Sequence, residues 1–224
     1  TPKPSSAASD VYKRQDFFCP RLLGLPLLRG RFRLRREPND FLRKQVAGLK
    51  PGRAICLAEG EGRNAVHLAR LGHKVIAQDL SATGLAKALA LASELQLSLQ
   101  TLCCDLADWQ PESESVDLVV AIWMHLPQDL RAEVHRKAVS ALKPGGTLIL
   151  EAYTPRQLDL RTDGPPVVDL LIEPEMVALE LKGLEFQLLK ETRRWISEGP
   201  YHQGESAVVQ AVGRKQPRKT CQAT

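Results

Sequence analysis

The sequence lacks the features that mark membrane-spanning and secreted proteins. No apolar run approaches the roughly 20 residues that a membrane-spanning helix needs. Gly24 and Pro26 interrupt the short apolar stretch at 22–28, which therefore does not match a secretory signal. With 43% hydrophobic and 25% charged residues, the composition is typical of an ordinary globular domain. We therefore expect a cytoplasmic protein without a membrane partner.

Cysteine is scarce, and its spacing excludes the usual cysteine chemistry. The five cysteines include no C-x-x-C pair, and Cys103 is adjacent to Cys104, which suits neither a zinc site nor an easy disulfide. No spacing of His, Cys and Asp suggests another metal site. We expect no metal, and we interpret Cys56, Cys103 and Cys104 as small apolar residues of strands.

Positive charge is absent from the middle of the chain and confined to its ends. Residues 1–36 hold nine basic and two acidic residues, and residues 213–224 add four basic ones and no acid. Residues 37–212 hold 18 basic and 24 acidic residues. A nucleic-acid-binding domain carries its basic residues on the domain itself. We therefore do not expect nucleic acid as a partner, despite a net charge of +5.

The first 36 residues differ in pattern from the rest of the chain. They open with Pro, Ser and Ala, and the segment Ser9–Gln15 resembles translated adapter sequence. We predict an irregular or artefactual N-terminal segment at 1–36, one domain at 37–215 and a basic tail at 216–224. A basic, disordered arm is the alternative for the first segment.

From residue 37 onward, strand-like and helix-like segments alternate. Short apolar runs predict the strands, and Asn, Gly or Pro at the segment ends delimit the helices. The predicted strands are 54–58, 74–78, 100–104, 117–122 and 147–153, the predicted helices lie at 38–50, 63–71, 83–97 and 127–142, and turns are expected at 111–115 and 143–146. Two further strand-like runs, 186–196 and 207–212, are joined through 198–204 and predict a hairpin. The fold class is thus α/β: a doubly wound, Rossmann-like, mostly parallel seven-stranded sheet with a C-terminal antiparallel hairpin.

The first predicted strand leads into a glycine turn and then a helix. A pair of glycines such as Gly60-x-Gly62 marks only a turn by itself. The second predicted strand, however, is followed by Asp79, 19 positions after Gly60. Backbone amides at a helix N-terminus and a carboxylate one strand away are the groups that hold a nucleotide's polar part and its ribose. The layout predicts a cofactor that contains a nucleoside.

Two features bear on which cofactor this is. Asp105 follows the third predicted strand, where its carboxylate could accept a hydrogen bond from an adenine amino group. Asn64 and Ala65 stand where a dinucleotide fingerprint would place its third glycine, so that fingerprint is incomplete. A nucleotide-dependent oxidoreductase remains the alternative enzyme.

The ordered set of motifs from Glu37 to Lys215 resembles class I S-adenosylmethionine-dependent methyltransferases, most closely the tellurite-resistance and thiopurine-type branch that acts on small molecules. The matching segments are Ala58–Asn64, Asp79–Ser81, Cys104–Leu106, Val116–Val120 and Leu142–Gly146. The resemblance implies an enzyme that transfers a methyl group from S-adenosylmethionine to a small-molecule acceptor by in-line displacement, as a monomer or a weak homodimer. It implies no particular catalytic residue.

The resemblance also implies which residues bind the cofactor. Glu59, Gly60 and Gly62 would flank its methionine part, Asp79 would hold the ribose hydroxyls, and Asp105 with Leu106 would border the adenine. The full set of expected cofactor-binding residues is Glu59, Gly60, Gly62, Asp79, Leu80, Asp105, Leu106 and Ile122.

The chain departs from the family pattern at two places. Cys56 stands where such enzymes usually carry an acid that helps order the glycine loop, and residues 1–36 do not match the family's aromatic-rich opening segment. These departures leave open a catalytically degenerate module that only binds the cofactor.

Candidate acceptor-binding residues follow the later strands, because ligands of open α/β sheets lie beyond the carboxyl ends of the strands. They are His125, Tyr153, Tyr201 and His202. Trp123 and Met124 are interpreted as packing residues, because large apolar side chains are usually buried in the core. A thiolate or another soft anionic acceptor would need no general base.

Overall fold

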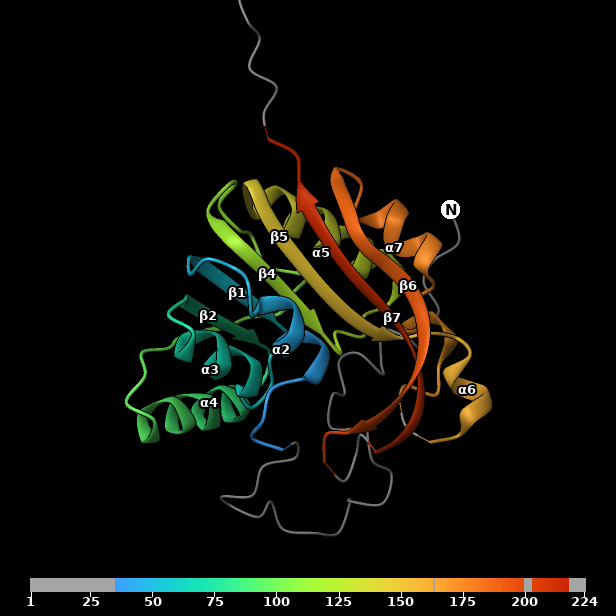
Figure 1. The fold of residues 1–224 in the computed structure, drawn as a ribbon, viewed down its shortest axis with the longest axis horizontal. Helices are drawn as coiled ribbons and strands as arrows, with labels where there is room; N and C mark the ends of the chain where they lie inside the picture. The colour runs from blue at the N-terminus through green and yellow to red at the C-terminus, as the bar shows by residue number, and fades with distance from the viewer. Residues whose placement is uncertain (1–34, 163, 200–202, 218–224) are drawn as a thin grey trace, which may run out of the picture.

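The computed structural model describes residues 35–162, 164–199 and 203–217. Most of the predicted N-terminal segment and of the predicted tail lies outside these residues. The sheet has seven strands in the order β3-β2-β1-β4-β5-β7-β6, as Figure 1 shows. The strands are β1 (Arg53–Leu57), β2 (Lys74–Asp79), β3 (Gln100–Cys103), β4 (Val116–Ile122), β5 (Leu142–Tyr153), β6 (Leu184–Ser197) and β7 (Gln203–Lys215). Strands β1 to β5 are parallel, and β7 runs antiparallel to both β5 and β6. The predicted α/β fold class is confirmed.

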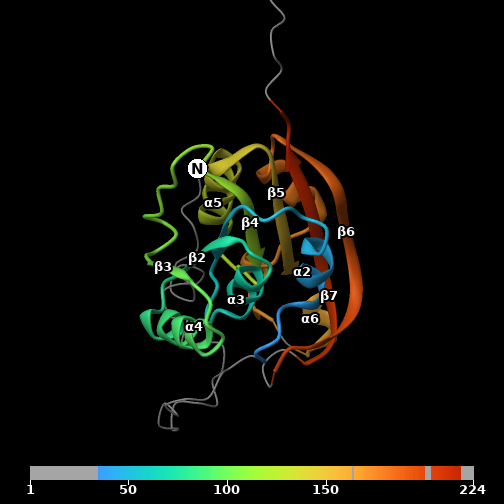
Figure 2. The same ribbon diagram turned by 60° about the vertical axis from the view of Figure 1, so that its left-hand side comes forward.

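Helices cover both faces of the sheet, as Figures 1 and 2 show. The helices are α2 (Asp40–Val46), α3 (Arg63–Arg70), α4 (Ala82–Glu94), α5 (Gln128–Ala141), α6 (Gln157–Leu160) and α7 (Pro174–Glu180), with a 3-10 turn at Val168–Leu170. The predicted helix starts and ends have visible causes. The Asn39 side chain caps α2 by accepting the Leu42 N–H, and Gly72 follows α3 in the left-handed conformation (φ 90°).

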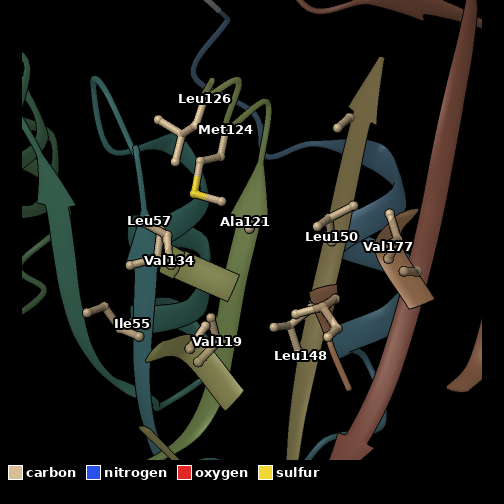
Figure 3. Packing of buried hydrophobic residues seen from close by; sticks show 14 of the residues in the cluster. Ile55, Leu57, Val119, Ala121, Met124, Leu126, Val134, Leu148, Leu150 and Val177 are labelled. Atoms are coloured by element: carbon tan, nitrogen blue, oxygen red, sulfur yellow. The ribbon is translucent and has the colours of Figure 1, made fainter. Parts of the chain in front are cut away.

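Alternate residues of the central strands face opposite helical layers. Ile55 and Val119 belong to the cluster that contains Val134 of α5, and Figure 3 shows this packing. The intervening residue Cys56 belongs to the cluster that contains Leu68 of α3. Strands buried on both faces are uninterrupted apolar runs, which is why the sequence of β4 shows no alternation of polar and apolar residues.

The structure corrects several boundaries. The turn predicted at 143–146 is instead the irregular start of β5, because Leu142 already pairs with Val116. A register shift between Val116 and Leu118 absorbs the extra residues as a bulge. The short helices α6 and α7 were not predicted, because four and seven residues give too little periodicity.

Cys56 is fully buried, as expected of a small strand residue, but Cys103 is exposed. Cys103 lies in β3, an edge strand whose four residues are all exposed. Cys103 is thus a strand residue, as interpreted, but it lies on the exposed edge of the sheet and not in the core. In the part of the chain that the structure describes, no helix has both the length and the apolar character to cross a membrane.

A buried ion pair joins α5 to α7. Arg131 of α5 lies 3.0 Å from a carboxylate oxygen of Glu180, whose other oxygen is 2.7 Å from His135 Nδ1. Burial opposes the charge, but His135 and Arg131 hold the pKa of Glu180 below its ordinary value. Arg131 also donates to the carbonyls of Leu126 and Leu171, so it fixes the segments that follow β4 and precede α7.

Replacing Glu180 by Gln tests the contribution of this ion pair to stability. The substitution keeps the shape but leaves the Arg131 charge buried without its counterion, so we expect the free energy of unfolding to fall by about 3 kcal/mol. Urea denaturation measures the change. Glu175→Gln, at an exposed position of the same helix, is the matched control and should change stability by no more than about 0.5 kcal/mol. Equal effects of the two substitutions would contradict a stabilising role for the pair.

Candidate functional site

The loop between β1 and α3 turns through left-handed backbone at Ala58 (φ 50°), Gly60 (φ 66°) and Gly62 (φ 89°). A Cβ on Gly62 would lie only 2.3 Å from the Cβ of Ala88, so glycine is needed there for the loop to pack on α4. A Cβ on Gly60 would meet nothing within 4 Å. The loop therefore presents open space at Gly60, where a ligand can approach the backbone.

Asp79 lies at the end of β2, against this loop. Its Oδ2 accepts the Gly60 N–H at 2.7 Å, and its Oδ1 accepts the Ser81 N–H at 2.8 Å. The carboxylate is 6% exposed and is therefore fixed in orientation. A carboxylate has about four acceptor positions, so two bonds to amides leave capacity for the hydroxyls of a ligand.

Gln78 is a residue of the candidate site that the sequence analysis missed. Its Oε1 accepts the Ala58 N–H at 3.0 Å, and its Nε2 donates to the Cys104 carbonyl at 2.8 Å. The side chain is almost fully buried and joins the end of β3 to the glycine loop. A polar residue in an apolar strand, directly before Asp79, was the signal that could have identified it.

The remaining predicted cofactor-binding residues lie at the same edge of the sheet, because β1 to β4 are parallel and end together. Leu80 follows β2 and is 39% exposed, and Asp105 follows β3 and accepts the Ala107 N–H at 2.9 Å. Leu106 and Ile122 are buried in the core on opposite sides of the sheet. The structure thus brings the predicted set to one edge, with Leu106 and Ile122 as apolar support.

Glu59 is a buried acid within the glycine loop. Its Oε1 accepts the N–H groups of Asn64 and Ala65 in the first turn of α3, each at 2.8 Å. Burial raises the pKa of Glu59 to about 7, although these two amides and the nearby Arg63 favour the charged form. Cys56 contacts the Glu59 carboxyl, and burial followed by this acid raises the pKa of the Cys56 thiol well above its ordinary value.

A second buried carboxylate, Glu198 at the end of the hairpin strand β6, collects four donors. Asn39 donates at 2.9 Å, the Trp123 indole donates at 2.9 Å, Arg194 lies at 3.4 Å, and Arg63 forms an ion pair with it. Burial opposes ionisation, but Arg63, Trp123 and Arg194 hold the pKa of Glu198 below its ordinary value. Glu198 thereby ties the hairpin to the first residue of α3 and to the end of β4.

Glu151 in β5 extends this polar cluster. Its carboxylate accepts from Asn39 at 2.7 Å, from Gln210 at 2.7 Å and from Arg194 at 2.6 and 2.9 Å. Glu151 and Glu198 are both fully buried, and two arginines balance their two charges. The sequence analysis missed both acids; Glu151, an acid among the apolar residues at the end of β5, gave a local signal.

The candidate residues His125 and Tyr153 form an aromatic stack with Trp123. The ring centroids of Trp123 and Tyr153 are 4.6 Å apart, and those of His125 and Tyr153 are 5.4 Å apart. Trp123 adopts a left-handed backbone (φ 59°), held by its N–H donating to the Glu151 carbonyl at 2.9 Å. Strained backbone of this kind is concentrated at functional sites.

Met124 and Tyr153 are both buried. Met124 packs in the core, as Figure 3 shows, which agrees with its interpretation as a packing residue. Tyr153 is fully buried, so it supports the stack from the protein interior. Tyr201 and His202 lie outside the described residues.

A hollow of about 380 Å³ is lined by α3, the end of α4 and the segment that precedes α2. Its lining includes none of the eight predicted cofactor-binding residues. It is lined by Arg36, Glu37, Pro38, Arg63, Val66, His67, Arg70, Leu91, Glu94 and Leu95. The geometry of the glycine loop, and not this hollow, therefore defines the candidate site. In residues 35–162, 164–199 and 203–217, no cluster of three or more His, Cys, Asp or Glu is arranged to hold a metal ion.

The raised pKa of Glu59 predicts a pH-dependent cost to stability. As the pH rises from 4.5 to about 7, the unfolded chain releases this proton before the folded protein does, so the free energy of unfolding falls. The full difference corresponds to about 3 kcal/mol. Replacing Glu59 by Gln should remove this contribution. The free energy of unfolding of the variant, relative to that of the wild type, should therefore be higher at pH 8 than at pH 5.

Urea denaturation of both proteins across that pH range measures the difference. Glu112→Gln, which removes an exposed carboxyl group, is the control and should leave the pH dependence unchanged. A Glu59→Gln variant whose stability parallels that of the wild type at every pH would contradict the burial of a titrating acid.

Comparison with known proteins agrees with this site. Residues 54–146, which include the glycine loop, Asp79 and Asp105, match the family described as a methyltransferase domain. No curated protein matches the chain in sequence.

Solved structures share the fold at low sequence identity. TehB from Haemophilus influenzae matches with a TM-score of 0.64 and 18% identity over 78% of this chain and 61% of its own. A S-adenosylmethionine-dependent methyltransferase from Methanosarcina mazei matches with a TM-score of 0.65 and 13% identity over 81% of this chain and 99% of its own. A third solved structure is described by the conversion of a disulfide bond into a thioacetal group during echinomycin biosynthesis. It matches with a TM-score of 0.66 and 18% identity over 80% of this chain and 82% of its own.

The residues of the site fit the cofactor of this family. Gly60 leaves space at the loop, and Asp79 beside it keeps acceptor capacity for ribose hydroxyls. The fold, the matched domain and this fit lead to one conclusion. Residues 54–146 thus form a methyltransferase domain, and the chain has the fold of solved methyltransferases that depend on S-adenosylmethionine.

Proposed function

We propose that this enzyme binds S-adenosylmethionine across the glycine loop and transfers its methyl group to a small-molecule acceptor by in-line displacement. The observation that carries the proposal is the hydrogen bond from the Gly60 amide to Asp79, next to open space at Gly60. When bound, the cofactor supplies a methyl group already activated by a positive sulfur. The protein then has to align the acceptor atom and exclude water, which can lower a barrier by several kcal/mol.

Each end of a parallel strand has a role in this proposal. Asp79 accepts from the ribose hydroxyls, and Asp105 with the adjoining Leu106 borders the adenine. The loop residues Glu59, Gly60 and Gly62 flank the methionine part, and Leu80 and Ile122 complete the cofactor-binding set. Gln78 supports them all indirectly, because it bonds both the glycine loop and the end of β3.

The acceptor side lies beyond β4 and β5 in this proposal. Trp123 and His125 are half-buried and stack with the fully buried Tyr153, so their rings are held in fixed orientations. Fixed aromatic surfaces orient a small organic acceptor. Tyr201 and His202 are proposed to contribute from the loop between β6 and β7.

The acidic domain favours a small molecule over nucleic acid, because residues 37–212 carry more acidic than basic side chains. Among the structural neighbours, one comes from sulfur chemistry in echinomycin biosynthesis and another is the N-methyltransferase NodS from Bradyrhizobium japonicum. Thiols and amines are therefore the first acceptor classes to test. A thiolate would need no general base.

We further propose a domain at 37–215 that works in the cytoplasm. The thiols of Cys56, Cys103 and Cys104 are free, and Cys103 is exposed, which fits a reducing compartment. We propose a monomer or a weak homodimer as the working form.

Replacing Asp79 by Asn tests the cofactor site. An amide has one acceptor oxygen in place of two, so it cannot serve Gly60, Ser81 and a pair of ribose hydroxyls together. We expect affinity for S-adenosylmethionine to fall about tenfold or more in calorimetric titration. Asp108→Asn, at an exposed position after β3, is the control and should bind as the wild type does.

Thermal unfolding of each variant separates lost binding from lost folding. The release of S-adenosylhomocysteine in the presence of a panel of thiols and amines then reports methyl transfer. A folded wild-type protein that binds NAD but neither adenosyl-sulfur compound would contradict the proposal. Another structural neighbour is the [4+2]-cyclase SpnF, so binding without turnover would instead favour a non-transferring role.

A further inference from the structure

Glu59 fastens the start of α3 to the end of β1. The helix begins after Gly62, which has no side chain to cap it, yet the amides of Asn64 and Ala65 are both bonded to one oxygen of Glu59 at 2.8 Å. Glu59, which lies three residues before Gly62 in the chain, therefore caps the helix in place of Gly62. A charged acceptor at helix amides forms a stronger hydrogen bond than a neutral one.

The same loop is anchored to β2 by its backbone. Glu59 N–H donates to the Gln78 carbonyl at 2.9 Å, and Gly60 N–H donates to Asp79 at 2.7 Å. Between these anchors and α3, Lys87 of α4 pairs with Glu61 at 2.6 Å on the outer side of the loop, and the Glu59 carboxylate holds the inner side to α3. Loss of the Glu59 contact would remove the bond between the loop and the first turn of α3, at the point where the cofactor binds in the proposed function.

The charges around Glu59 come from every element that packs on it. Arg63 of α3 favours the ionised carboxylate, Asp79 of β2 disfavours it, and the Cys56 thiol of β1 contacts it. Burial is the largest opposing factor. A ligand that brings positive charge to the loop would add to the effect of Arg63 and favour ionisation.

We infer that the ionised Glu59 is the positioning residue of the cofactor loop, and that the affinity for S-adenosylmethionine depends on the charge of this one buried carboxylate. The inference rests on the proposed function. A purely structural cap would need only an acceptor oxygen, which a Gln side chain also offers. Charge dependence thus separates the two roles.

The test compares wild type, Glu59→Gln and the double variant Cys56→Asp/Glu59→Gln by calorimetric titration. The probes are S-adenosylmethionine and methylthioadenosine, which lacks both the amino-acid part and the positive sulfur. We expect Glu59→Gln to weaken S-adenosylmethionine binding about tenfold or more and to change methylthioadenosine binding far less. Because Cys56 contacts Glu59, an Asp at 56 returns a carboxylate to the same space and should restore most of the lost affinity.

Dependence on pH gives a second measurement. The ratio of the wild-type to the Glu59→Gln affinity should increase between pH 6 and pH 8, as Glu59 ionises. Comparing the two proteins cancels the titration of the cofactor itself. Thermal unfolding confirms that each variant is folded at both pH values.

Three results would overturn the inference: equal affinities of wild type and Glu59→Gln, an equal loss for both probes, or a folded double variant that recovers nothing. Failure of the proposed function is a different result. In that case the wild-type protein itself would bind neither S-adenosylmethionine nor methylthioadenosine.

Discussion

The site depends on the hydrogen bonds that join the glycine loop after β1 to the end of β2, above all the bond from the Gly60 amide to the Asp79 carboxylate. This bond requires the left-handed backbone of the glycine loop, and that backbone in turn requires glycine at Gly62, because α4 approaches so closely there. Packing of α4 on the loop and ligand access at Gly60 are therefore two results of one local conformation. A change in either would disturb the other.

The antiparallel hairpin is part of this site and not an addition at the edge of the sheet. Its residues Glu198, Arg194 and Gln210 join the polar cluster around Glu151 and reach Arg63 at the start of α3. Burying two carboxylates is costly unless their donors are all in place, so the cluster favours one arrangement of hairpin, helix and β4 end. The hairpin thereby fixes both the helix behind the cofactor loop and the indole of Trp123.

Much of the fold and part of the site could be predicted because their signals are local. The glycine turn, Asp79 and Asp105 each follow an apolar run, and parallel strands necessarily bring such positions to one edge. The shared cluster of Glu151 and Glu198 could not be predicted, since the two acids lie far apart in the sequence and are joined only through Asn39 and Arg194. The positive φ of Trp123 has no sequence signal either, because tertiary hydrogen bonds impose it.

Cys56 illustrates why a motif position cannot be interpreted alone. The absence of an acid at Cys56 suggested a loosened glycine loop, but the structure places the Glu59 carboxyl group in contact with this thiol, in the interior of the loop. What matters for the loop is a buried negative charge at the amides of α3, and either strand or turn could supply it. Burial raises the pKa of Glu59 to about 7, so a buried negative charge at this position destabilises the free protein. A positive ligand bound at the loop in the proposed function would lower that cost, so free energy lost in folding would be regained in binding.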